Sequence, residues 1–141
     1  MSGFPVTIYH NPDCGTSRNV LAMIEAAGYA PEVVEYRTAG WTHALLAELL
    51  AAMDARPRDI LRDKGTPAAE LGLLDPAVSD DAILDAMVAH PILVNRPIVV
   101  TPRGTALCRP SEAVFALLDR VPVEFTKEDG EMVLNPPSSR V

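Results

Sequence analysis

Cysteine is scarce in this sequence, with only Cys14 and Cys108 among 141 residues. The two cysteines lie far apart and the three histidines are scattered, so none of them has the spacing of a metal-binding motif. We therefore expect no metal site. We also expect both thiols to be free, as is usual in a reducing compartment.

Positive charge and long apolar runs are also lacking. Twelve Lys and Arg against nineteen Asp and Glu leave a net charge of −7, which disfavours nonspecific binding to nucleic acid. No apolar run is long enough to cross a bilayer, and the first residues show no basic leader followed by a hydrophobic core. We expect a cytoplasmic protein that binds neither nucleic acid nor membrane, in which local arginines must hold any anionic ligand.

What the chain has instead is a regular alternation of strand and helix patterns, with 48% hydrophobic residues. This length and apolar content predict a single domain over residues 1–141. Ser79 and Ser111 are predicted to cap helices, and Val88 is expected on the buried face of the first of these. The predicted elements are strands at 5–10, 32–36, 98–102 and 105–109, and helices at 16–27, from 42, from 57, at 79–90 and from 111.

The order of these elements is strand, helix, strand, helical block, strand, strand, helix. It is typical of an α/β protein with a thioredoxin-like or glutaredoxin-like fold, in which the first helix crosses between parallel strands and the last two strands are antiparallel. We expect a mixed four-stranded sheet with a helical insertion at about 40–90. Beyond Pro122 the pattern weakens, and a loose C-terminal tail is expected from about 132.

The stretch YHNPDCGTSRN, residues 9–19, places Cys14 between a proline-containing turn and the predicted start of a helix. The first N–H groups of a helix have no partner within it, and the helix dipole adds partial positive charge. Both favour a thiolate, so we expect a lowered pKa for Cys14. Gly15, Thr16 and Ser17 offer N–H and hydroxyl groups for an oxyanion. One loop would then supply both a nucleophile and an anion cradle.

Other interpretations of the cysteines stay open. A lone cysteine is more often a small buried apolar side chain, although the loop position of Cys14 disfavours that interpretation. Thioredoxins carry a second thiol where this chain has Ser17, so Cys14 has no local disulfide partner and needs a thiol from elsewhere. Cys108 lies on a short predicted strand, which favours packing. His10 ends the first strand, where it is either a core or surface histidine or a charge that lowers the thiol pKa.

Three arginines, Arg62, Arg96 and Arg109, lie in places that look apolar or turn-like. Arg96 falls within the run HPILVNRPIVVTP, where a buried guanidinium needs an anionic partner. Each arginine taken alone is more often a surface or salt-bridge residue. Together they suit a tetrahedral oxyanion such as phosphate or arsenate, because guanidinium groups make bidentate contacts with such anions.

Pro97 follows Arg96 directly. Proline in an apolar run ordinarily interrupts a strand. In a thioredoxin-like fold, however, a cis-proline stands opposite the cysteine loop, just before the third strand. We therefore predict a cis Arg96–Pro97 peptide bond.

Four segments closely resemble the glutaredoxin-coupled arsenate reductases of bacteria, and the resemblance runs from about Val6 to Glu131. The segments are IYHNPDCGTSRN, ILR, HPILVNRPIVVTPRGTALCRPSE and FTKEDGE. The resemblance implies a thioredoxin-like enzyme of arsenic resistance and detoxification, which reduces arsenate to arsenite with glutathione as co-substrate and glutaredoxin as partner, without a bound cofactor. It also implies that the nucleophile is Cys14, that the oxyanion ligands are Arg62, Arg96 and Arg109, and that His10 helps to activate the thiol.

Two rival functions are compatible with the same fold. One is a thioredoxin-like regulator that binds RNA polymerase, although such regulators often use a Cys-x-x-Cys switch, which Ser17 precludes here. The other is a general glutathione-dependent thiol reductase. The set of arginines disfavours that activity, since a disulfide has no oxyanion to bind.

Overall fold

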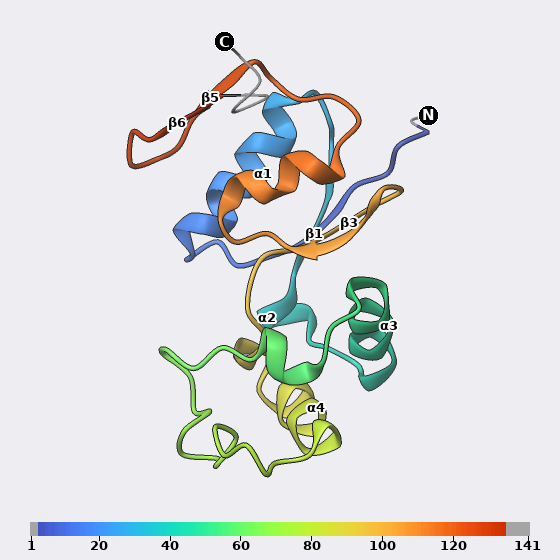
Figure 1. Cartoon of the computed structure of the whole chain (residues 1–141), viewed down its shortest axis with the longest axis vertical. Helices are drawn as coiled ribbons and strands as arrows, with labels where there is room; N and C mark the ends of the chain where they lie inside the picture. Colours follow the sequence, from blue (N-terminus) through green and yellow to red (C-terminus); the bar gives the residue numbers. More distant parts are fainter. Residues whose placement is uncertain (1–2, 135–141) are drawn as a thin grey trace. The chain divides into compact units, whose positions relative to one another are not determined.

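A computed structural model describes residues 3–134, which divide into two compact units (Figure 1). The sheet unit consists of residues 3–35 and 96–134, and the helical unit of residues 36–95. The helical unit occupies the part of the chain in which the sequence predicts an insertion. The single domain over 1–141 stays a prediction.

The sheet unit is built on a four-stranded sheet with the strand order β2-β1-β3-β4. β1 pairs with β2 in parallel and with β3 antiparallel, and β3 pairs antiparallel with β4. The sheet is therefore mixed, as predicted, with α1 as the crossover between its parallel strands. The bounds are Thr7–His10 for β1, Gly15–Ala26 for α1, Glu32–Glu35 for β2, Ile98–Thr101 for β3 and Gly104–Leu107 for β4.

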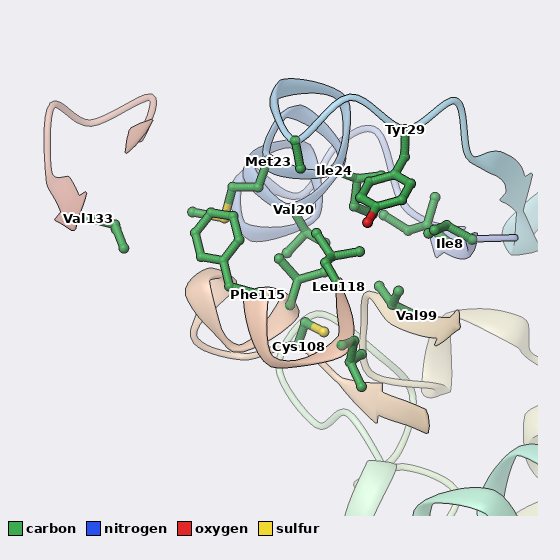
Figure 2. Close-up of a cluster of buried hydrophobic side chains, with 14 residues drawn as sticks. Ile8, Val20, Met23, Ile24, Tyr29, Val99, Cys108, Phe115, Leu118 and Val133 are labelled. Carbon is green, nitrogen blue, oxygen red and sulfur yellow. The ribbon is translucent and has the colours of Figure 1, made fainter. Parts of the chain in front are cut away.

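The core of this unit lies between one face of the sheet and two helices, α1 and η3 (Ser111–Leu117), which lie side by side (Figure 1). Apolar residues at helical spacing on α1 meet alternate residues of the strands, because a helix repeats every 3.6 residues and a strand every two. Figure 2 shows the side chains that meet there, among them Ile8, Val20, Met23, Ile24, Val99, Cys108, Phe115 and Leu118.

The last predicted helix differs from the expectation. It is a 3-10 helix, and Pro110 rather than Ser111 occupies the capping position, with no side-chain cap. Ser111 is instead the first helical residue and is only 3% exposed. Val114, Leu117 and Leu118 are buried as predicted.

A second sheet comes after η3 in the chain. It consists of two strands, β5 (Glu124–Thr126) and β6 (Met132–Leu134). The sequence analysis missed this hairpin, because strands of three residues are too short to show periodicity. The expectation of a loose tail from 132 is wrong for residues 132–134, which form β6 and bury Val133. The rest of the expected tail, NPPSSRV, lies outside the described residues.

The helical unit contains α2 (Tyr36–Ala39), α3 (His43–Met53), η1 (Pro57–Ile60), α4 (Asp80–Ala89) and η2 (Pro91–Leu93). Thr42 caps α3, and the predicted cap of α4 is confirmed, since the Ser79 side chain accepts the N–H of Ala82. The buried position predicted for Val88 is wrong, because this residue is 38% exposed. At 3.6 residues per turn it falls beside the stripe of Ile83, Leu84 and Met87 rather than within it.

Within residues 3–134, none of the helices has both the length and the apolar character needed to span a membrane. The same residues bring together no group of three or more His, Cys, Asp or Glu side chains that could hold a metal ion.

Candidate active site at the start of helix α1

The loop between β1 and α1 carries Cys14 at the capping position of the helix. The Asn11 carbonyl accepts the N–H of Cys14 at 3.0 Å, and the Asn11 side chain accepts the N–H of Asp13 at 2.9 Å. Asn11 is only 3% exposed, so the residue that makes both hydrogen bonds of the turn is buried. This turn directs the chain from the end of the strand into the helix with Cys14 at the junction.

The Cys14 side chain is 7% exposed. Burial raises the pKa of its thiol, but several interactions act in the opposite direction and the net result is a lowered pKa. The N–H groups of Ser17 and Thr16 bond to the sulfur, the charge of Arg96 attracts the thiolate, and the Arg109 guanidinium donates to it. This direction agrees with the lowered pKa expected for Cys14, and its role as a nucleophile stays a prediction.

Two of the predicted arginines converge on this thiol. The Arg109 Nη1 atom lies 3.7 Å from Cys14 Sγ and 3.0 Å from the carbonyl oxygen of Arg96, to which it donates. The predicted cis Arg96–Pro97 bond is present, and the Arg109–Pro110 bond, which the sequence analysis did not single out, is also cis. Arg109 is exposed and Arg96 half-buried. Both guanidinium groups therefore belong to the environment of the sulfur.

His10 and Ser17 form a buried pair beneath the loop. The His10 Nδ1 atom lies 2.6 Å from Ser17 Oγ, which also accepts the N–H of Asn11 at 3.1 Å. His10 is 5% exposed and Ser17 is fully buried. These contacts engage the Ser17 hydroxyl within the loop, and the Ser17 backbone N–H bonds to the thiol. The role of Ser17 in binding an oxyanion stays a prediction.

Two further predicted residues lie elsewhere. Arg62 belongs to the helical unit, where its N–H donates to the carbonyl of Leu93 at 2.7 Å, and its role in binding an oxyanion stays a prediction. Cys108 is fully buried in the core of the sheet unit (Figure 2), as the packing interpretation expected. Burial raises the pKa of its thiol to about 12.

The Asn-Pro dipeptide predicts a turn at the end of the first strand, and the structure has Asn11 in that turn. The sequence analysis gave no role to Arg18. Arg18 lies in the first turn of α1, where its Nη1 atom donates to the carbonyl of Pro12 at 2.8 Å and its guanidinium pairs with Glu128. The only signal for Arg18 was its place four residues after the cysteine.

A thiol with backbone N–H donors and two guanidinium groups around it can do two things. Its lowered pKa increases the fraction of thiolate, which is the nucleophilic form of cysteine. The arginines can meanwhile neutralise an anionic substrate and the charge that develops as it reacts. Together these are the requirements for attack by sulfur on an oxyanion.

Comparisons with known proteins agree with this geometry. Residues 9–117 match the ArsC family. The chain is 60% identical to "Arsenate reductase ArsI2" of Synechocystis sp. over 137 residues, which is 96% of this chain and 98% of that protein. It is 48% identical to an arsenate reductase of Escherichia coli over 96% of this chain and 97% of the relative.

Among solved structures, the arsenate reductase of Vibrio cholerae superposes with a TM-score of 0.78 at 38% identity, covering 83% of this chain and all of the other. This likeness, together with the mixed sheet, confirms the predicted thioredoxin-like fold. On the match of residues 9–117 and the identity to these relatives, this chain belongs to the ArsC family.

Proposed function

We propose that this protein reduces arsenate to arsenite, with Cys14 as nucleophile and with glutathione and glutaredoxin as the source of electrons. The observation that carries the proposal is the 3.7 Å approach of the Arg109 guanidinium to the Cys14 sulfur at the start of a helix. The names of the relatives, which are arsenate reductases over nearly their whole lengths, support arsenate as the substrate.

In the first step, the Cys14 thiolate attacks the arsenic of arsenate. A sulfur–arsenic bond forms and one oxygen leaves as hydroxide or, after protonation, as water. Arg96 and Arg109 neutralise the remaining oxygens, and the N–H groups at the helix start hold the thiol in its reactive form before the attack. Arsenic is still As(V) in this adduct.

In the second step, the thiol of glutathione displaces another oxygen from arsenic, again as water. The glutaredoxin thiolate then attacks the glutathione sulfur, which breaks the bond between that sulfur and arsenic. The electron pair of the broken bond stays on arsenic, so As(V) becomes As(III) and a mixed disulfide of glutaredoxin and glutathione is formed. Water releases arsenite from Cys14 and restores its thiol.

The structure of the sheet unit supports the proposed requirement for an external thiol. Ser17 replaces the second cysteine of a Cys-x-x-Cys motif, and the Cys108 thiol is fully buried with a pKa of about 12. A thiol that stays protonated at neutral pH attacks poorly. Neither residue is therefore suited to resolve the adduct on Cys14.

The test is arsenate-dependent oxidation of NADPH in the presence of glutathione, glutaredoxin and glutathione reductase. The native protein and the matched variant Cys108→Ala should both turn over, whereas Cys14→Ser should fall to background. Omission of glutaredoxin alone, and of glutathione alone, should each stop the native reaction. Absence of turnover by folded native protein would contradict the proposal, and turnover without either thiol would contradict its electron source.

A further inference from the structure

The segment FTKEDGE, residues 125–131, forms the end of β5 and the turn of the hairpin, and the proposed chemistry gives it no role. Its turn lies against the first turn of α1. The Arg18 Nε atom donates to Glu128 Oε2 at 2.8 Å, and Nη2 donates to Oε1 at 3.1 Å. The pair is bidentate, which fixes the direction of the guanidinium as well as its distance.

Arg18 also holds the loop that carries the reactive thiol. Its remaining terminal nitrogen, Nη1, donates to the carbonyl of Pro12 at 2.8 Å, two residues before Cys14. The three nitrogens of one guanidinium thus connect the hairpin turn to the cysteine loop. Because the guanidinium is planar and rigid, one orientation of it satisfies the contacts with Glu128 and with the Pro12 carbonyl together.

A second contact joins the same two segments. The Asn19 side chain accepts the N–H of Glu128 at 3.0 Å, so neighbouring residues of α1 hold both the side chain and the backbone of Glu128. The carboxylate also lies beside the first residue of the helix, since a Cβ atom built on Gly15 would come within 3.7 Å of Glu128 Oε1. The turn is therefore adjacent to the residue that follows Cys14.

On its other side the turn is anchored to the segment that follows Arg109. The Lys127 ammonium pairs with Glu112 at 2.7 Å and with Glu131 at 3.0 Å, and its side chain is only 9% exposed. The contact with Lys127 lowers the pKa of Glu112, so both members of the pair are charged at neutral pH. Glu112 lies three residues after Arg109, on η3.

We propose that this hairpin turn is a positioning element of the active site, in which the Arg18–Glu128 pair holds the loop of Cys14 in register with Arg109. The expected effect on arsenate turnover rests on the proposed function, whereas the expected effect on the pKa of the Cys14 thiol does not. Exposed ion pairs contribute little to stability, and Arg18 and Glu128 are both near half exposure. The role of this pair is therefore to fix geometry rather than to stabilise the fold.

The inference makes a prediction of opposite sign to that of a simple charge effect. If Glu128 acted only through its negative charge, its removal would lower the pKa of the Cys14 thiol, because a nearby negative charge disfavours a thiolate. If Glu128 positions the loop, its removal loosens the N–H and guanidinium contacts that stabilise the thiolate. The thiol pKa then rises although a carboxylate has been removed.

The experiment measures the rate of Cys14 alkylation by iodoacetamide against pH in Glu128→Ala, Arg18→Gln and the double variant. Glu124→Ala is the matched control, because Glu124 is an exposed carboxylate on β5 of the same hairpin. Asn19→Ala removes the acceptor of the Glu128 N–H without any change of charge. The measurement uses no arsenate, so it stays decisive even if the native protein does not reduce arsenate.

We expect the midpoint of alkylation to rise by about 0.5 pH unit in both single variants, with little further change in the double variant. Asn19→Ala should shift it in the same direction, and Glu124→Ala should leave it at the native value. Where arsenate is reduced, kcat/KM should fall about tenfold in Glu128→Ala. A midpoint at or below the native value in Glu128→Ala, or a double variant restored to the native midpoint, would overturn the inference.

Discussion

The sheet unit contains two buried cysteines with opposite properties. Cys14 is 7% exposed and its thiol pKa is lowered, whereas Cys108 is fully buried and its thiol pKa is raised to about 12. Burial opposes ionisation at both positions. At Cys14 it is outweighed by the N–H donors of a helix start and by two arginines, whereas burial is the cause that acts at Cys108. The pKa of a buried thiol therefore depends on the donors around it and not on burial alone.

The largest expected difference is in chemical labelling of the two thiols. With a pKa of about 12, only about one in 10⁵ Cys108 thiols is ionised at pH 7, and the core also excludes the reagent. Iodoacetamide at pH 7 should therefore label Cys14 alone, as measured by mass spectrometry of peptides. Denaturation before labelling is the control and should expose both thiols. Equal labelling of Cys14 and Cys108 in the folded protein would contradict the expected difference between the two thiols.

The next effect comes from removing one donor at Cys14. Arg109→Gln removes the guanidinium that lies 3.7 Å from the sulfur, so the thiol pKa should rise. Arsenate turnover should fall about 100-fold, because one preorganised donor of this kind stabilises the transition state. Alkylation against pH and the coupled NADPH assay measure the two quantities.

Arg103→Gln is the matched control for that variant. Arg103 precedes β4 and donates to the carbonyl of Leu118 rather than to the thiol. Its replacement should leave the alkylation midpoint unchanged. A midpoint that shifts equally in both variants would mean that net charge, and not the Arg109 contact, lowers the thiol pKa.

The smallest expected effect is on stability against pH, where the two cysteines should have opposite signs. The folded pKa of Cys14 is lowered, so its contribution to the free energy of unfolding is present above the usual thiol pKa and is lost as pH falls through the folded value. The folded pKa of Cys108 is raised. Its contribution is present below the usual thiol pKa and decreases above it by about 1.4 kcal/mol per pH unit.

Urea unfolding of the native protein, Cys14→Ser and Cys108→Ala between pH 7 and 10 measures both contributions. The stability of the native protein relative to Cys14→Ser should increase with pH up to the usual thiol pKa. Its stability relative to Cys108→Ala should decrease above that pKa. The same sign for both differences would show that the two thiol environments do not differ as described.

Local sequence was sufficient for several features of the site. The turn and helix start around Cys14 are specified by neighbouring residues, so the lowered thiol pKa could be predicted from the position of Cys14 alone. The mixed sheet followed from the order of strand and helix patterns. The cis bond before Pro97 followed from that fold, and the cis bond before Pro110 was not anticipated.

Other features depended on contacts between residues far apart in the chain. Sequence shows that Ser17 carries a hydroxyl near the thiol, but only the structure shows that this hydroxyl contacts the buried His10. The short strands β5 and β6 have too little pattern to be predicted. The contacts that bind their turn to the rest of the unit join Glu128 to Arg18 and Lys127 to Glu112.

The sequence by itself determined that Cys14 lies at a helix start, because the unpaired N–H groups and the dipole there are local properties of a few consecutive residues. Only the tertiary structure decided which partners surround the thiol. The 95 residues that separate Cys14 from Arg109, and the 110 that separate Arg18 from Glu128, place these contacts beyond any local pattern. Chain folding brings such groups together through packing of the core, which depends on all of its residues at once.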